Sequence, residues 1–501
     1  MRKENKIKIV LINLLLVIIL STFLTSVVAC GSSGRGRVRR NPTITWTLDI
    51  MDVDQSFSRY PWIKGKNVYI AVIDTGLCSY WDEFIPRENI EMKWARRFHD
   101  LGLDIEVESE SGEYPGPKII ESRDIVASNE EWLDEGHHGT KVISYITGWY
   151  YQDTSTGKRY FFEGIAPQAK IIPIKARTAY YLLQDEENDI WAWGEAYSDA
   201  MMEAAIKYIT KLANKNKEDR FVIYLGGGVS DPEDIPRTLK AIDKAVKKDI
   251  VIVAAAGNTG FTAPEIPNEF RSMMYPAAYE PVISAGVAAY AYVDPETNEY
   301  LGEFAPFAPT TPFSIPSEFN PLQFLDDVPE GDNGKLVGPA LGSSRAFEDQ
   351  DLDVLGVGML NMPGPGKKYD GQPTDAARLY YYDDVIDYSG GSSGTAGQVA
   401  GICALILQAN PSLKPAEVEK ILEETADDIT PSNPFPYGIS LVPPMSSFPL
   451  GITMPAIWGD TLPMFFPWMN DTGLDISGGG LVQADAAVKA ALQARYHWWR
   501  W

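Results

Sequence analysis

The chain has 501 residues, enough for one large domain with insertions or for two to four smaller domains. Hydrophobic residues make up 45% and charged residues 22%, so the chain can bury a sizeable core and wholesale disorder is not expected. A net charge of −24 repels phosphate backbones, which argues against a nucleic-acid partner. Three cysteines without a C-x-x-C pair exclude a disulfide framework and a cysteine-based zinc site.

The first 30 residues have the pattern of an export signal. A basic start is followed by an apolar run over residues 9–28, which ends in Val-Val-Ala-Cys. This ending resembles the lipobox of bacterial lipoproteins, with Cys30 as the lipidated residue. An uncleaved transmembrane anchor is the alternative, because a run of this length can span a bilayer. Either interpretation predicts an exported, extracytoplasmic protein held at the membrane, with residues 31–60 as a linker.

Beyond the linker, apolar β-branched runs alternate with helical patterns. Near-continuous apolar runs are typical of strands buried on both faces of a parallel sheet. Six such runs are strand candidates: 68–74, 170–176, 220–226, 249–257, 281–287 and 352–358. Four segments are helix candidates: 191–215, 236–248, 393–409 and 415–427. The alternation predicts an α/β fold, a doubly wound and mostly parallel sheet with helices on both faces.

Three stretches interrupt this alternation, at 95–133, 288–350 and 430–475. None has the periodicity of an independent core, so we expect surface insertions on one domain that spans residues 61–492. Residues 493–501 are aromatic and basic, and we interpret them as a tail. We find no internal repeat.

Three polar segments lie where chemistry is expected in such a fold. Asp74 ends the first strand candidate, at the carboxyl edge where open α/β sheets form their sites, although many strands end in an aspartate that only caps a turn. His138, followed by Gly-Thr, opens an apolar helix as either a cleft residue or a structural one. Ser393 lies in a run of small residues that admits a substrate backbone, but a Ser/Gly loop with an N-cap has the same pattern. Each signal is weak alone.

Together the three segments resemble the subtilisin-like serine proteases (subtilases), in which Asp, His and Ser occur in this chain order. The resemblance extends across most of the predicted domain. The similar segments are 64–76 (KGKNVYIAVIDTG), 137–142 (HHGTKV), 164–176, 224–228 (YLGGG), 251–260 (VIVAAAGNTG), 275–287 and 478–492. The last of these resembles the family's terminal Gly-rich turn and helix.

The resemblance implies a serine endopeptidase that hydrolyses polypeptides. Asp74, His138 and Ser393 would form the catalytic triad, with His137 as the spare histidine. Asn258 and the Ser393 backbone N–H would stabilise the oxyanion. Two further segments would bind the substrate: Leu225, Gly226 and Gly227 as a backbone edge, and Ala255, Ala256 and Gly257 as part of the primary pocket.

The serine segment departs from the family pattern Gly-Thr-Ser-Met-Ala-x-Pro. Ser392 stands for Thr, Gly394 for Met and Gly397 for Pro. These departures motivate an alternative from another class, a catalytically inactive surface binding protein on a subtilase fold. The presence of all four polar groups of the site favours the enzyme.

No metal or other cofactor is predicted. Glu83 lies where some subtilases place a calcium-ligating acid, but one carboxylate does not define a calcium site. Cys78 and Cys403 are predicted to be buried thiols rather than a disulfide.

Overall fold

A computed structural model of the chain describes most of the predicted domain. All described residues belong to the compact unit Pro42–Trp501. They are residues 48, 51–77, 81–83, 85–98, 138–152, 159–185, 190–196, 198–259, 272–293, 300–303, 337–339, 343–347, 349–357, 391–429 and 478–497. The predicted export signal with Cys30, the residues His137 and Cys78, and the predicted insertion 430–475 therefore lie outside the described residues.

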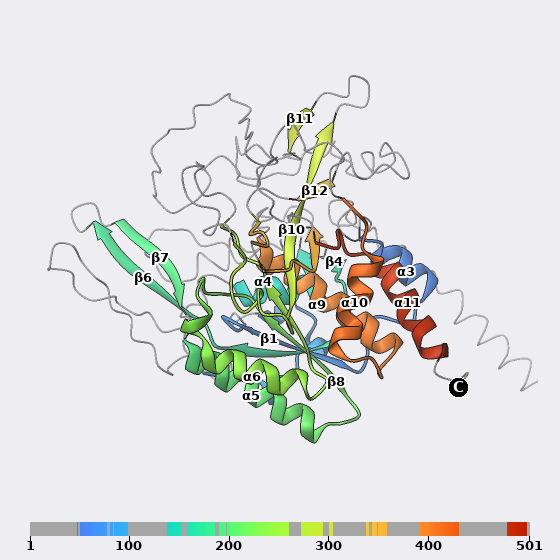
Figure 1. Cartoon of the computed structure of the whole chain (residues 1–501), viewed down its shortest axis with the longest axis horizontal. Helices are drawn as coiled ribbons and strands as arrows, with labels where there is room; N and C mark the ends of the chain where they lie inside the picture. Colours follow the sequence, from blue (N-terminus) through green and yellow to red (C-terminus); the bar gives the residue numbers. More distant parts are fainter. Residues whose placement is uncertain are drawn as a thin grey trace, which may run out of the picture. The chain divides into compact units, whose positions relative to one another are not determined.

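The centre of the fold is a mostly parallel sheet (Figure 1). Its strand order is β11-β10-β9-β8-β1-β5-β2, and β12 and β13 also pair with β10. Only the pairs of β10 with β11 and with β12 are antiparallel among the described strands of this sheet. The strands are β1 Val68–Asp74, β2 Arg96–Arg97, β5 Lys170–Lys175, β8 Arg220–Leu225, β9 Val251–Ala255, β10 Ile283–Val293, β11 Tyr300–Glu303, β12 Val337–Pro339 and β13 Val354–Val357.

Helices cover both faces of this sheet. Successive side chains of a strand point to opposite faces, so each buried strand supplies two cores. Ile70 and Val72 of β1 join a cluster with α3, α4, α9, α10 and α11, whereas Ala71 and Ile73 join a cluster with α5 and α6. The helices are α3 Val53–Arg59, α4 His138–Thr147, α5 Asp199–Lys215, α6 Pro236–Val246, α9 Ser392–Ala409, α10 Pro415–Thr425 and α11 Ala484–His497. The predicted doubly wound α/β fold is confirmed.

The helix α9 is the buried centre of the first cluster. Nearly all of its residues are buried, including the free thiol of Cys403, whose pKa is raised by burial. A helix that is apolar on every side has no face for solvent, which is why its sequence predicts a central position. The prediction of a buried thiol at Cys403 is confirmed.

One helix prediction is wrong in its first residues. Residues 191–196 belong to β7 Ile190–Ala196, which forms an antiparallel hairpin with β6 Thr178–Asp185. The stretch alternates aromatic and small residues with a period of two, which suits a strand. The helix α5 begins only after Ser198, whose Oγ accepts a hydrogen bond from the backbone N–H of Met201 (3.1 Å).

Several predicted boundaries divide structured elements. The end of the predicted linker contains α3, which buries Val53 and Phe57 on one helical face. The sheet continues into the predicted insertions through β2, β10, β11 and β12. The helix α11 runs to His497, five residues into the predicted tail.

The remaining elements are short. They are the hairpin β3 Gly148–Gln152 and β4 Arg159–Glu163, and the 3-10 turns η1 Trp81–Glu83, η2 Arg87–Asn89, η3 Met92–Trp94 and η4 Pro232–Asp234. Glu83, the residue considered for calcium, ends η1. Within the part of the chain that the structure describes, no helix is both long and apolar enough to cross a bilayer.

Candidate active site

The candidate site lies at the topological switch point of the sheet. The strand β1 lies between β5 and β8, so the chain leaves β1 toward one side and later returns on the other. In open α/β sheets, such a switch point opens a crevice at the carboxyl ends of the strands. Asp74 ends β1 at this edge, and α4 begins with His138, whose Nδ1 lies 2.8 Å from each carboxylate oxygen of Asp74.

Asp74 is ionised although it is buried, with only 1% of its surface exposed. Burial alone raises the pKa of a carboxyl, but His138, Arg177 and the Thr75 N–H (2.6 Å) outweigh it, and the pKa of Asp74 is lowered. An ionised carboxylate can only accept hydrogen bonds. The proton between the two side chains therefore lies on Nδ1 of His138, and Nε2 is the ring atom that points to other partners.

Ser393 is connected to this pair through Gly226. It is the second residue of α9, and its hydroxyl donates a hydrogen bond to the carbonyl of Gly226 (3.1 Å). Gly226 directly follows β8 and lies against Asp74, because a Cβ at this position would collide with Asp74 Oδ2. Only glycine lets the end of β8 come this close, so Gly226 links the nucleophile candidate to the carboxylate–imidazole pair.

Asn258 adjoins the first turn of α9. Its Oδ1 accepts a hydrogen bond from the Ser392 backbone N–H (2.9 Å), and an N–H group can only donate. The amide Nδ2 is therefore the group left to donate elsewhere. The N–H of Ser393, the next residue of the first turn, has no intrahelical acceptor. Gly257 completes the junction by donating its N–H to Ser392 Oγ (3.0 Å).

Comparison with known proteins identifies the family. The sequence model described as the subtilase family matches residues 65–439. The chain belongs to the subtilase family. The resemblance drawn from the sequence is thus confirmed, and so is its class of enzyme, a subtilisin-like serine protease.

Curated relatives of this subtilase include bacterial serine proteases. The major intracellular serine protease of Bacillus subtilis (strain 168) is 26% identical over 318 residues, which cover 62% of this chain and 77% of the relative. Mycosin-3 of Mycobacterium tuberculosis is 25% identical over 330 residues, covering 63% of this chain and 61% of the relative.

Among solved structures, Sphericase matches with a TM-score of 0.44 and 18% identity, over 86% of this chain and 96% of that one. MycP1 from Mycobacterium smegmatis matches with a TM-score of 0.43 and 18% identity, over 91% of this chain and 86% of that one.

The two glycines that depart from the subtilase serine motif have a local cause in α4. A Cβ at Gly397 would lie 2.9 Å from Val142 Cγ1, and a Cβ at Gly394 would lie 3.1 Å from the ring of Tyr145. Side chains of α4 thus lie in the space that a side chain at either position would enter. The two glycines fit their packing against α4, so these departures do not favour the inactive alternative.

The residues predicted to bind substrate lie at the carboxyl ends of β8 and β9, and Leu225 and Ala255 are the last residues of these strands. The side chain of Leu225 packs in the core with α5 and α6, and the carbonyl of Gly226 faces the site. Ala255, Ala256 and Gly257 are buried. The backbone of Ala256 is engaged on both sides, because its N–H donates to Ala285 and its carbonyl accepts from Met274.

One residue of the site was missed by sequence reasoning. Arg177 lies two residues after β5, and its Nη1 is 3.2 Å from the Gly226 carbonyl, 3.4 Å from His138 Nδ1 and 3.9 Å from Asp74 Oδ2. It falls just beyond the segment 164–176 that resembles the family. No spacing or motif in the sequence marks it.

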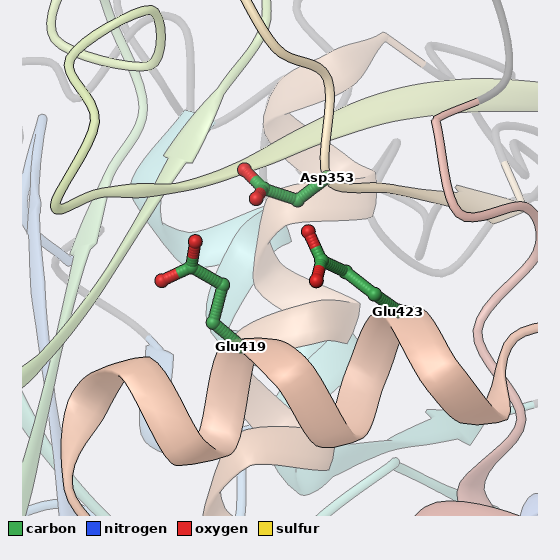
Figure 2. A group of neighbouring side chains, drawn as sticks. All are labelled: Asp353, Glu419 and Glu423. Atoms are coloured by element: carbon green, nitrogen blue, oxygen red, sulfur yellow. The ribbon is translucent and has the colours of Figure 1, made fainter.

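A second group of titratable side chains lies away from this site. Figure 2 shows Asp353, just before β13, facing Glu419 and Glu423 of α10. One oxygen from each lies within 4.8 Å of the others, close enough to contact one cation. Burial, then the neighbouring carboxylates, raise the pKa of Glu419 to about 8 and that of Glu423 to about 7. At neutral pH these three residues therefore form a proton-sharing carboxyl cluster.

Proposed function

We propose that this subtilase is an active endopeptidase in which Asp74, His138 and Ser393 form the catalytic triad. The observation that carries the proposal is the contact of His138 Nδ1 with both carboxylate oxygens of a buried, ionised Asp74. This contact leaves Nε2 as the only ring atom able to accept a proton. Ser393 donates a hydrogen bond to the carbonyl of Gly226, and Gly226 is the residue at which a Cβ would collide with Asp74.

The reaction begins with a rotation of the Ser393 side chain. In the structure its hydroxyl donates to Gly226, so turning about the Cα–Cβ bond must redirect the proton to His138 Nε2. Catalytic hydrogen bonds are often formed fully only when substrate is bound. The Ser393 Oγ then bonds to the scissile carbonyl carbon as its proton passes to Nε2, and the carbonyl oxygen becomes an oxyanion.

The intermediate collapses by breaking the C–N bond, and the imidazolium gives its proton to the leaving amine. Water repeats the sequence on the acyl-enzyme, which releases the carboxylate product and restores the Ser393 hydroxyl. Asp74 keeps its negative charge throughout and stabilises the imidazolium. Asn258 Nδ2 and the Ser393 N–H donate to the oxyanion, where charge develops in the transition state.

We infer that the substrate is an extended polypeptide. Residues 225–227 begin at the last residue of β8, and the backbone beyond Leu225 would pair with an added strand. The segment 255–257, at the end of the neighbouring strand β9, would line the pocket for the side chain before the scissile bond. Gly226 lies within residues 225–227, and its carbonyl accepts the hydrogen bond of Ser393. A strand added along this segment would therefore bring its backbone to Ser393.

We also propose that the protein acts outside the cytoplasm, tethered to the membrane through a lipidated Cys30. The support is the sequence alone, an apolar run that ends in Val-Val-Ala-Cys. One acyl chain anchors only marginally, so stable tethering needs a second chain on the same terminus. In the native host, Cys30→Ser should release the protein from the membrane fraction and change the mass of the N-terminal peptide; an unchanged mass would contradict lipidation.

Labelling with a fluorophosphonate tests the catalytic proposal. The wild-type chain should be labelled and should cleave a denatured protein, and Ser393→Ala should lose both activities while its thermal unfolding stays similar. Ser392→Ala is the matched control, because it removes the neighbouring hydroxyl, a buried acceptor for Gly257, and leaves Ser393 in place. Folded wild-type protein that is neither labelled nor active would refute the proposal, as would labelling that survives in Ser393→Ala.

A further inference from the structure

Arg177 is the cation that contacts both members of the carboxylate–imidazole pair. Its side chain is 19% exposed, that of His138 is 25% exposed, and that of Asp74 is fully buried. It reaches the pair from the loop after β5, whereas Asp74 ends β1 and His138 begins α4. The resemblance to subtilases assigns it no role.

Of the three contacts of Arg177, the one with Gly226 is the hydrogen bond. The guanidinium has only donors, and Nδ1 of His138 already donates its proton to Asp74 at 2.8 Å. Two donors cannot bond to each other, so the 3.4 Å approach of Arg177 Nη1 to Nδ1 is an electrostatic contact. If Arg177 did donate to Nδ1, the ring proton would move to Nε2 and His138 could not accept from Ser393. The shorter, charge-assisted bond to Asp74 prevents this tautomer.

The consequence concerns the charge of the imidazole. A cation at this distance stabilises the Asp74 carboxylate and disfavours a second positive charge on His138. Resting on the proposed function above, we propose that Arg177 is a positioning residue of the active site: it keeps His138 neutral, and therefore able to accept the Ser393 proton, at lower pH than the Asp74–His138 pair alone would allow.

Other polar and ionisable side chains come from the strands and helices that carry Asp74 and His138 or pack beside them. Tyr224 of β8 places its hydroxyl 3.5 Å from Asp74 Oδ2. Lys175 of β5 pairs in register with Asp74, and Lys141 lies one helical turn after His138. Ser393 is the polar side chain that α9 brings to Gly226. Among these groups, Arg177 is the one that is both cationic and within 3.4 Å of the ring.

The test is the pH dependence of kcat/KM for a peptide substrate, measured on the full-length chain at constant ionic strength. Arg177→Gln removes the charge but keeps an amide able to donate to Gly226, and Arg177→Lys keeps the charge. At a given pH on the acid limb, kcat/KM divided by its plateau value should be about three- to tenfold lower in Arg177→Gln than in the wild type, because the imidazole is then protonated more readily. Arg177→Lys should keep the wild-type limb.

Two further variants make the result decisive. Arg177→Met is a second neutral variant that keeps an apolar stem of similar length, in case the glutamine variant does not fold. Lys141→Gln removes a cation from α4 without touching Arg177. An unchanged acid limb in the folded neutral variants would overturn the proposal, even if the plateau fell, and so would an equal shift in Lys141→Gln.

Failure of the proposed function gives a different result. If the wild-type chain is neither labelled nor active, the protonation of His138 is still measurable by NMR on histidine-labelled protein, since the chain has only four histidines. A titration of the His138 resonance that moves to higher pH in Arg177→Gln supports the electrostatic role without any turnover. A His138 titration that is identical in the two proteins refutes it.

Discussion

Replacing Gly397 with alanine sets two effects of similar size against each other. Gly397 lies in the interior of α9, where alanine is favoured over glycine by about 0.8–1.0 kcal/mol of helix propensity. The new methyl group would lie 2.9 Å from Val142 Cγ1, closer than a Cβ contact allows, in a core where both residues are buried. Overpacking of this kind costs about 1–3 kcal/mol. We therefore expect Gly397→Ala to be neutral or to destabilise the protein by up to about 2 kcal/mol.

Truncating Val142 should reverse the sign of this effect. Val142→Ala alone removes buried methyl groups and should cost roughly 2 kcal/mol. In that background the methyl group added at position 397 no longer meets the Cγ1 of Val142, so Gly397→Ala should stabilise the protein by up to about 1 kcal/mol. Urea unfolding of the four proteins gives the coupling energy of the pair. Stabilisation by Gly397→Ala in the wild-type background, or an equal cost in both backgrounds, would refute the conclusion that Val142 fills the space beside Gly397.

Two predictions concern the active site and the carboxyl cluster. Asn258→Ala should lower kcat by about 10²–10³ with little change in KM, because an oxyanion-hole donor acts only when charge develops on the substrate oxygen; a loss that appears only in KM would argue against this role. The pKa values of Glu419 and Glu423 are raised, to about 8 and about 7. The folded state therefore keeps protons that the unfolded state releases above about pH 4.5, so stability should fall as pH rises from there to about 8, with a slope that solvent screening of these partly exposed carboxyls reduces. Glu419→Gln should flatten the fall of the melting temperature, whereas Glu203→Gln on α5 should keep it; equal slopes in all three proteins would show that the carboxyl cluster holds no excess proton.

Much of the fold could be predicted because each buried strand has a local signature. The run 68–74 matches β1 residue for residue, since a strand covered on both faces must be apolar throughout. The helix 393–409 begins one residue early, at Ser392, and is buried as its composition predicts. The error at 191–196 has the opposite cause. Its two-residue alternation suits a strand, but the partner strand β6 that stabilises it cannot be identified from the sequence of the segment itself.

The order and chemical type of the candidate site residues can be proposed from sequence alone, because the segments of Asp74, His138, Ser393 and Asn258 are short local motifs. Which of their groups meet depends on how the chain packs. The carbonyl of Gly226 receives both Ser393 and Arg177, and Arg177 comes from a loop whose sequence has no motif. Val142 and Tyr145 explain the glycines of α9 only once α4 is packed against that helix. Contacts between distant segments depend on sheet order and helix packing, which the local pattern of any one segment does not contain.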